Sequence, residues 1–238
     1  MLYYCPNMIS YKGFSTLEIL EGASNYNSWI AENFIKKLKS PVIEVGSGTG
    51  NISIYFSQQK ELFLTDKDPG LITHLKNKFK RKNIKINTLD ISKEILRTLQ
   101  GHFKSAIAIN VLEHINDDGK AFRNLHRLLV QGGRLFILVP AKKFAYTGLD
   151  KALGHYRRYE KEELIEKIKS AGFTIEKTYF FNFIGLFSWI VRDKIERCHT
   201  LKLYQVALFD KLVPVLKIIE GIIKPPLGVS LIVIARKK

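Results

Sequence analysis

Three acidic residues, Glu44, Asp66 and Asp90, each follow a short apolar stretch of the sequence, and a glycine-rich turn at 46–50 follows the first of them. A carboxylate can accept hydrogen bonds from a pair of hydroxyl groups or attract a positive charge. Glycines let the backbone turn sharply and let a ligand lie against it, because no Cβ is in the way. These residue types indicate a site for a ligand that carries hydroxyl groups and a positive charge.

The spacing of the glycines distinguishes among the known nucleotide-binding turns. The dinucleotide fingerprint Gly-x-Gly-x-x-Gly would place its third glycine at position 51, where the chain has Asn51. A phosphate-binding P-loop would need a lysine after Gly50, and none follows it. The carboxylate of Glu44 would not stabilise a negatively charged pyrophosphate, whereas it would stabilise a cationic ligand. A tight turn that binds no ligand is the remaining alternative.

Four stretches of the chain resemble the class I S-adenosylmethionine-dependent methyltransferases. Residues 44–50, which read Glu-x-Gly-x-Gly-x-Gly, resemble motif I of that family. Residues 110–140 contain Asn-x-Leu-Glu-His, then Gly-Gly, then Pro, and are similar to a second signature of the family. The Asn-Tyr-Asn-x-Trp group at 25–29 and the Gly-His-x-Arg-Arg-Tyr group at 154–159 resemble a bacterial subgroup, of methyltransferase type 11/12. The resemblance covers residues 24–181 well and residues 182–227 poorly.

The resemblance implies that the cofactor is S-adenosyl-L-methionine and that the product is S-adenosyl-L-homocysteine. Tyr26 and Asn27 would close over the methionine end of the cofactor, although Tyr26 and Trp29 fit a helix-packing role equally well. Asp66 would accept hydrogen bonds from both ribose hydroxyls, and Asp90 would accept one from the adenine amino group. The cofactor-binding residues expected on this basis are Tyr26, Asn27, Glu44, Gly46, Ser47, Gly48, Gly50, Asn51, Asp66, Lys67, Asp90, Ile91, Asn110 and Val111.

The implied reaction is an in-line displacement at a sulfonium methyl carbon, so much of the protein's contribution is positioning. A base is needed only if the acceptor is a hydroxyl or a protonated amine, and His155 could take that proton. Arg157 or Arg158 could hold an anionic group of the acceptor, or these charges could form an ion-pair network that only orders the loop. His114 is a further candidate base, but its place at a strand-to-helix turn also fits a hydrogen-bonding role. No metal is expected, because no cluster of His, Asp and Glu has ligand spacing.

The elements that must position these residues form a single doubly wound α/β domain. Its strands are expected at 42–45, 61–66, 84–89, 105–109, 134–140, 173–181 and 228–235, and the resemblance implies the order 3-2-1-4-5-7-6. Helices are expected at 30–38, 51–58, 69–79, 93–99, 160–170, 203–212 and 214–223, with another beginning at Asp117 or Asp118. The chain divides into an N-terminal helical cover (1–40), a cofactor-binding core (41–181), a helical cap inserted before the last strand (182–227), and that strand with a basic tail (228–238).

Composition and charge limit the partners that the chain can have. Its 238 residues fit one α/β domain, and its formal net charge of +16 predicts an anionic partner, unless the basic surface is only solvated. Anionic lipid headgroups and RNA are the two candidates, and nucleic acid is the less expected one. Two cysteines, Cys5 and Cys198, indicate no disulfide framework and fit a cytoplasmic protein. The sequence leaves the oligomeric state open.

The apolar segment 182–227 either caps an acceptor pocket while resting on a membrane surface, or packs on the sheet and completes the core. The first alternative predicts a lipid-linked acceptor, and the second leaves any small-molecule acceptor open. Two other classes of function compete with methyl transfer. A nicotinamide-dependent oxidoreductase is opposed by Asn51 and leaves Asp90 without a use, and a non-catalytic S-adenosylmethionine-binding protein would keep only the cofactor pocket.

Overall fold

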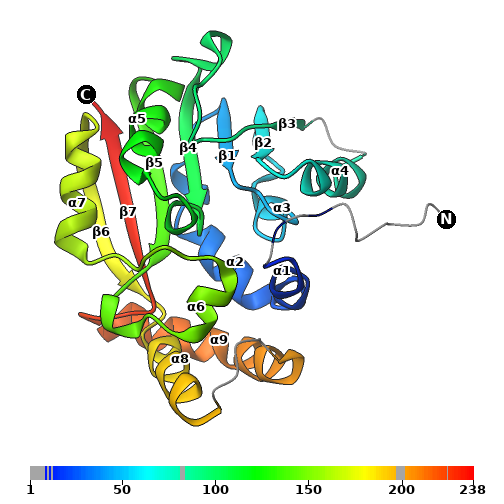
Figure 1. The fold of residues 1–238 in the computed structure, drawn as a ribbon, viewed down its shortest axis with the longest axis vertical. Helices are drawn as coiled ribbons and strands as arrows, with labels where there is room; N and C mark the ends of the chain where they lie inside the picture. The colour runs from blue at the N-terminus through cyan, green and yellow to red at the C-terminus, as the bar shows by residue number, and fades with distance from the viewer. Residues whose placement is uncertain (1–8, 10, 12, 81–83, 197–201, 224) are drawn as a thin grey trace.

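The computed structural model shows a seven-stranded sheet with helices on both faces (Figure 1). It describes residues 9, 11, 13–80, 84–196, 202–223 and 225–238, so both cysteines lie outside the described residues. The strands are β1 (Val42–Val45), β2 (Leu62–Asp66), β3 (Lys85–Thr88), β4 (Phe103–Ile109), β5 (Leu129–Pro140), β6 (Phe173–Phe181) and β7 (Ser230–Lys237). Their order is β3-β2-β1-β4-β5-β7-β6, which confirms the predicted fold class and order.

Pairing in the sheet is parallel from β1 to β5, and β7 is antiparallel to both of its neighbours. The helices are α1 (Phe14–Glu21), α2 (Ser24–Glu32), α3 (Ser53–Phe56), α4 (Pro69–Lys78), α5 (Asp118–Leu128), α6 (Gly148–Leu153), α7 (Lys161–Ser170), α8 (Phe183–Glu196) and α9 (Leu203–Ile223). Four short 3-10 turns complete the described structure: η2 (Ile35–Lys37), η3 (Arg97–Leu99), η4 (Leu112–His114) and η5 (Lys143–Ala145).

Two hydrophobic clusters cover the two faces of the sheet. α5 and α7 pack on one face, and α2, α3, α4 and α9 pack on the other. Because side chains alternate along a strand, Ile43 and Val45 of β1 point into the first cluster, and Val42 points into the second. Glu44 therefore shares the face of Val42, where helices exclude water, and its side chain is buried.

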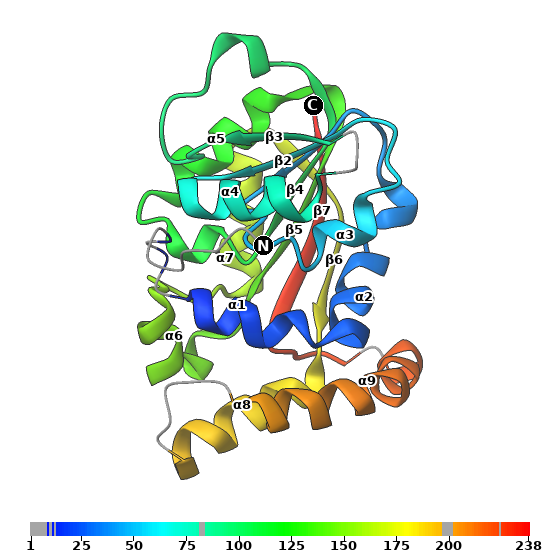
Figure 2. The ribbon, with the colours of Figure 1, turned by 90° about the vertical axis from the view of Figure 1, so that its right-hand side faces the viewer.

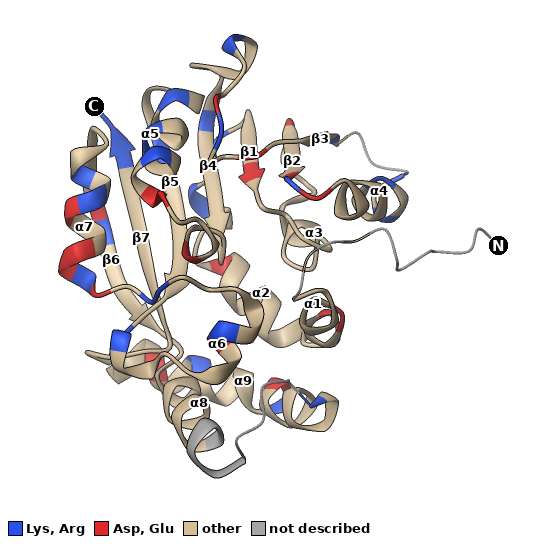
Figure 3. Ribbon diagram, in the orientation of Figure 1, with Lys and Arg blue, Asp and Glu red and all other residues tan. Residues whose placement is uncertain are grey.

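Four helices, α1, α6, α8 and α9, lie at one end of the sheet (Figure 2). This is the end at which β1 finishes, since the turn after β1 touches α1: Asn51 Nδ2 donates to the carbonyl of Leu17 at 2.8 Å. We call α8 and α9 the cap. Charged residues of both signs cover α7, and α9 also carries residues of both signs, separated by longer uncharged stretches (Figure 3). No helix among the described residues combines the length and apolar character needed to cross a membrane.

The expected helix at 93–99 is wrong, since the structure has only the 3-10 turn η3 in that stretch. Side chains bind backbone groups just before the expected helix and at its first residue, Lys93. Asn124 Nδ2 of α5 donates to the carbonyls of Ile91 and Lys93 at 2.8 and 2.6 Å, and Asp90 accepts from the backbone N–H of Ser92 at 3.0 Å. Such side-chain bonds compete with helix formation, which local sequence patterns do not reveal.

The helix boundaries differ from the prediction at both ends of the chain. The helix expected at 30–38 is α2, shifted to Ser24–Glu32, followed by η2. The two helices expected at 203–212 and 214–223 are one, α9, with Pro214 inside it. A proline has no N–H for the carbonyl four residues earlier, which is that of Asp210. That carbonyl instead accepts from Asn25 Nδ2 at 3.1 Å, so the helix continues.

Asp210 also caps α2 from another part of the chain. The residue at the N-cap position of α2 is Ala23, which has no polar side chain. The Asp210 carboxylate accepts from the backbone N–H groups of Asn25 and Tyr26 at 3.3 and 2.8 Å. These are unpaired donors of the first helical turn, where the helix dipole favours a negative charge. Asp210 is 7% exposed and joins the cap to the sheet through α2.

Asp210→Ala should therefore lower the free energy of unfolding by about 1–2 kcal/mol, the scale of losing a helix N-cap. Chemical denaturation followed by circular dichroism measures this loss. Lys211→Ala, at the exposed neighbouring position, is the matched control and should leave stability nearly unchanged. Equal losses in the two variants would show that Asp210 does not cap α2.

Candidate active site

A cavity of about 1540 Å³ opens at the end of the sheet where the parallel strands finish. Its walls come from the strand ends, α1, α2, the segment around 149–158, and the cap. Sites for one drug-sized ligand usually measure roughly 300–1,000 Å³. The cavity therefore has room for two ligands side by side, as a group-transfer reaction requires.

The glycine turn after β1 is packed so closely that side chains would not fit. Gly46 has φ +72°, and a Cβ there would lie 2.4 Å from Cγ2 of Val111. Gly50 has φ +77°, and a Cβ there would lie 2.7 Å from Cε2 of Phe79. Both the positive φ and the close neighbours exclude other residues. The turn consequently presents bare backbone to the cavity.

Asp66, at the end of β2, holds the glycine turn in place. Its Oδ2 accepts from the backbone N–H of Gly48 and its Oδ1 from that of Asp68, both at 3.0 Å. Burial raises the pKa of Asp66, and these hydrogen bonds partly offset the shift. A carboxylate oxygen has more than one acceptor site, so Asp66 can still accept from a ligand in the cavity.

Glu44 is a buried acid beside the glycine turn. Its side chain is 3% exposed, and its Oε2 has no hydrogen-bond partner among the residues that the structure describes. Burial raises the pKa of Glu44 to about 7, against the smaller opposing effect of Ser53 and Ser47. A cation placed beside this carboxylate would supply the partner that the protein itself does not provide.

The predicted cofactor residues converge on the cavity with one exception. Thirteen of the fourteen line it, and Gly50 lies behind the turn against Phe79. Asp90 Oδ1 accepts from the backbone N–H and the hydroxyl of Ser92, at 3.0 and 2.6 Å. Asn110 adopts the left-handed conformation, with φ +52°, directly after β4. That conformation is uncommon for a residue other than glycine and turns the chain at the cavity wall.

Tyr26 and Asn27 both line the cavity and both have internal contacts. The Tyr26 ring packs on Phe181 and Phe209 with centroid distances of 6.1 and 5.7 Å. Asn27 Nδ2 donates to the carbonyl of Leu20 at 2.8 Å, which holds α1 against α2. The packing alternative for Tyr26 is thus realised in the structure, and contact with the cofactor stays a prediction.

Asp150 organises the 154–159 loop that follows β5. Its carboxylate is fully buried, accepts from Arg158 Nε at 3.0 Å, and lies 2.8 Å from His155 Nδ1. Burial alone would raise the pKa of Asp150, but the His155 hydrogen bond and the Arg158 charge outweigh it and hold that pKa below its ordinary value. The Arg158 guanidinium also lies over the Trp189 ring of α8, 4.7 Å from its centroid. The loop, His155 and the cap are therefore fixed to one another.

Arg157 is engaged on the other side of the loop. Its guanidinium contacts Asp118 at 2.9 Å and donates to the carbonyl of Asn116 at 2.7 Å. Asp118 also accepts from Tyr159 and Lys167, at 2.9 and 2.8 Å. Arg157 is not among the residues that line the cavity. These contacts match the ion-pair alternative, and a role in acceptor binding stays a prediction.

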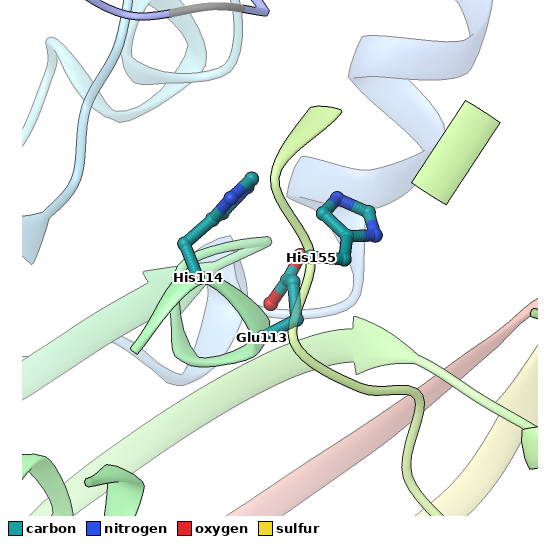
Figure 4. A group of neighbouring side chains, drawn as sticks. All are labelled: Glu113, His114 and His155. Atoms are coloured by element: carbon teal, nitrogen blue, oxygen red, sulfur yellow. The ribbon is translucent and has the colours of Figure 1, made fainter. Parts of the chain in front are cut away.

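The two predicted histidines meet over a buried acid that sequence reasoning did not single out. The rings of His114 and His155 lie edge to face with their centroids 4.6 Å apart, and Glu113 lies beside them (Figure 4). Burial, followed by the nearby His155, lowers the pKa of His114 to about 4. Tyr11 Oη lies 3.4 Å from His114 Nε2. Glu113 belongs to the Asn-x-Leu-Glu-His stretch, and its position next to His114 is the sequence feature that points to it.

Comparisons with known proteins agree with this geometry. Residues 21–178 match the family described as a methyltransferase domain. A highly reducing polyketide synthase of Strobilurus tenacellus is 28% identical over 129 residues, which cover 50% of this chain and 5% of that protein. The ubiquinone/menaquinone biosynthesis C-methyltransferase of Edwardsiella ictaluri is 26% identical over 121 residues, which cover 48% of each chain. The chain thus matches half or less of the length of these relatives.

Among solved structures, an S-adenosylmethionine-dependent methyltransferase from Thermotoga maritima has the same fold. Its TM-score is 0.64 at 14% identity, and the match covers 96% of this chain and 98% of that one.

Glu44→Gln should stabilise the ligand-free protein at about pH 8 relative to the wild type. The folded-state pKa of about 7 exceeds the ordinary value of 4.5, so ionisation opposes folding as the pH rises from 4.5 through 7. The shift corresponds to at most about 3 kcal/mol, fully expressed above pH 7 and absent near pH 4.5. Urea unfolding of both proteins at about pH 5 and about pH 8 measures the difference.

Glu94→Gln removes an exposed carboxylate and is the matched control. A Glu44→Gln variant whose stability relative to the wild type did not change with pH would contradict the buried, proton-retaining state of Glu44.

Proposed function

This chain belongs to the methyltransferase domain family, and we propose that it is an S-adenosylmethionine-dependent methyltransferase whose acceptor is an apolar, lipid-linked molecule reached from a membrane surface. The observation that carries the proposal is an apolar cavity wall, supplied by the cap, that continues onto the protein's exposed surface. The relative involved in ubiquinone and menaquinone biosynthesis acts in the synthesis of lipid-linked molecules, which supports the same acceptor class.

The residues at the strand ends fit the cofactor in chemical type. S-adenosylmethionine supplies a methyl group on a positively charged sulfur and also carries an amino group and ribose hydroxyls. We assign the amino group to the unpaired Glu44 oxygen, the hydroxyls to Asp66, and the adenine amino group to Asp90. The bare backbone at Gly46 and Gly48 lets the ligand lie directly against the turn.

Asp66→Ala should lower the affinity for S-adenosylmethionine by about 1.5–3 kcal/mol, because a charged hydrogen bond is lost. Isothermal titration calorimetry measures the affinity directly. Thr88→Ala, at the exposed end of the neighbouring strand β3, is the control and should bind normally. Since Asp66 also holds Gly48, thermal melts establish that the variant is folded. Unchanged affinity in a folded Asp66→Ala variant would remove the ribose assignment.

The second half of the cavity is the acceptor side in this proposal. Trp189 of α8 and Leu208, Phe209 and Leu212 of α9 line it, and all four offer apolar surface. His155 lines the same region and is fixed by Asp150 through its Nδ1. We place the reacting atom of the acceptor next to His155, in line with the methyl group. Positioning of this kind can supply a large part of the rate enhancement in a displacement reaction.

The outer surface of the cap is apolar and exposed. Leu208 and Leu212 line the cavity and are still 62% and 49% exposed, while Val215, Ile218 and Ile222 are 57%, 65% and 77% exposed. The alternative, in which both segments complete the core, accounts for the narrow buried edge of α9, formed by Asp210, Val213 and Leu216. It leaves the exposed face without a partner.

An anionic membrane suits this face. Apolar side chains of an amphipathic helix enter the headgroup boundary, and each basic residue near the surface adds about 1 kcal/mol. The net charge of +16 favours an anionic surface over a neutral one. A lipid tail that lies in the membrane can then enter the cavity past Leu208 and Leu212, which belong to both surfaces.

The protein should consequently co-sediment with vesicles that contain phosphatidylserine, and the bound fraction should fall as salt is added. Changing both Ile218 and Ile222 to Asp should lower vesicle binding more than tenfold, since burying each isoleucine is worth about 1.5–3 kcal/mol. Changing Gln58 and Gln131 to Asp alters the net charge equally outside the cap and is the matched control. Absence of binding to these vesicles at low ionic strength would contradict membrane docking.

A further inference from the structure

Three potential metal ligands come together on the acceptor side of the cavity. Glu113 and His114 belong to η4, after β4, and His155 belongs to the loop after β5. One ligand atom from each lies within 4.8 Å of the others (Figure 4). The backbone N–H of Tyr156 donates to the carbonyl of Glu113 at 2.8 Å, so the two segments are held together by the fold.

The Glu113 carboxylate is buried without a hydrogen-bond partner among the described residues. Its side chain is 0% exposed, and neither oxygen has a hydrogen-bond partner within the described part of the chain. Burial of a carboxylate without a partner is costly. Figure 4 shows the carboxylate beside both imidazole rings. A proton could link Glu113 to only one neighbouring imidazole, whereas a metal ion can be shared by all three groups.

His155 is already oriented as metal-binding histidines are. Its Nδ1 is 2.8 Å from Asp150 Oδ1, which leaves Nε2 as the atom that can bind a ligand. Metal-bound histidines commonly hydrogen-bond a carboxylate through their other ring nitrogen, which fixes the tautomer and the ring orientation. Arg158 pairs with Asp150 and keeps that carboxylate in place.

We propose that Glu113, His114 and His155 bind one divalent transition-metal ion, such as Zn²⁺ or Mn²⁺. Imidazole ligands suit Zn²⁺ and the carboxylate suits Mn²⁺, whereas Mg²⁺ and Ca²⁺ are bound in proteins mainly by oxygen ligands. Zinc binds such ligands at about 2.0–2.2 Å, so neighbouring donors lie roughly 3–4 Å apart. The three ligand atoms lie within 4.8 Å of one another, which is close to that spacing.

The ion would keep open positions toward the cavity, because His114 and His155 both line it. An oxygen atom of the acceptor can occupy such a position and be held next to the transferred methyl group. This role rests on the proposed function, whereas metal binding itself does not. The proposal replaces the sequence-based expectation that the chain binds no metal.

The test is calorimetric titration of the full chain, free of any affinity tag and treated with chelator, with Zn²⁺ and separately with Mn²⁺. We expect one equivalent to bind to the wild type. Glu113→Gln and His155→Gln should each lower the affinity at least tenfold. His102→Ala removes an exposed imidazole elsewhere and should bind like the wild type.

Parallel titrations with S-adenosylmethionine keep this test separate from the proposed function. Variants that lose metal but bind the cofactor normally support the proposal and show that they are folded. His114→Gln, at a partly exposed position, provides a second ligand variant if Glu113→Gln does not fold. A wild type that binds neither ion, or ligand variants that bind as tightly as His102→Ala, would overturn the site whatever the methyl acceptor is.

Discussion

Parallel pairing of β1 with β2 and β4 is the constraint on which the rest of this structure depends. Parallel strands end at the same edge, so the residues that follow each of them meet there. In this chain that edge collects the glycine turn, Asp66, Asp90 and Asn110. Helices on both faces also bury Glu44, and one of its oxygens has no hydrogen-bond partner among the described residues. This part of the site therefore favours a cationic group.

The second half of the cavity depends on two buried carboxylates that join the cap to the core. Asp210 of α9 caps α2, and Asp150 holds Arg158, whose guanidinium covers Trp189 of α8. Both acids are shielded from solvent, and an unpaired charge there would be expensive. The cap is therefore attached by specific polar contacts at its inner edge, while much of its apolar surface stays exposed.

This arrangement separates two tasks within one cavity. The strand ends bring polar groups that suit a nucleoside and a charged amino acid, and the cap brings apolar groups that suit a lipid tail. Glu113, His114 and His155 come together on η4 after β4 and on the loop after β5, and both histidines line the cavity. A metal ion at these three residues and a membrane at the cap would both act on the acceptor. The two proposals therefore concern the acceptor and not the cofactor.

The sequence by itself determined the strands of the sheet and the residues at its edge, and its resemblance to a known family implied the strand order. Apolar stretches ending in an acid, and glycines at fixed spacing, are local patterns, and the structure places thirteen of fourteen expected cofactor residues at the cavity. Tertiary structure decided what depends on distant partners. Asp210 and Asn25 are 185 residues apart, yet their contact caps α2 and lets α9 continue through Pro214.

Asn124 similarly removes the helix expected at 93–99, because its amide takes the carbonyls of Ile91 and Lys93. The meeting of Glu113, His114 and His155 required the loops after β4 and β5 to be folded side by side. No spacing along the chain encodes that contact, because it arises from the pairing of two strands and a hydrogen bond between their loops.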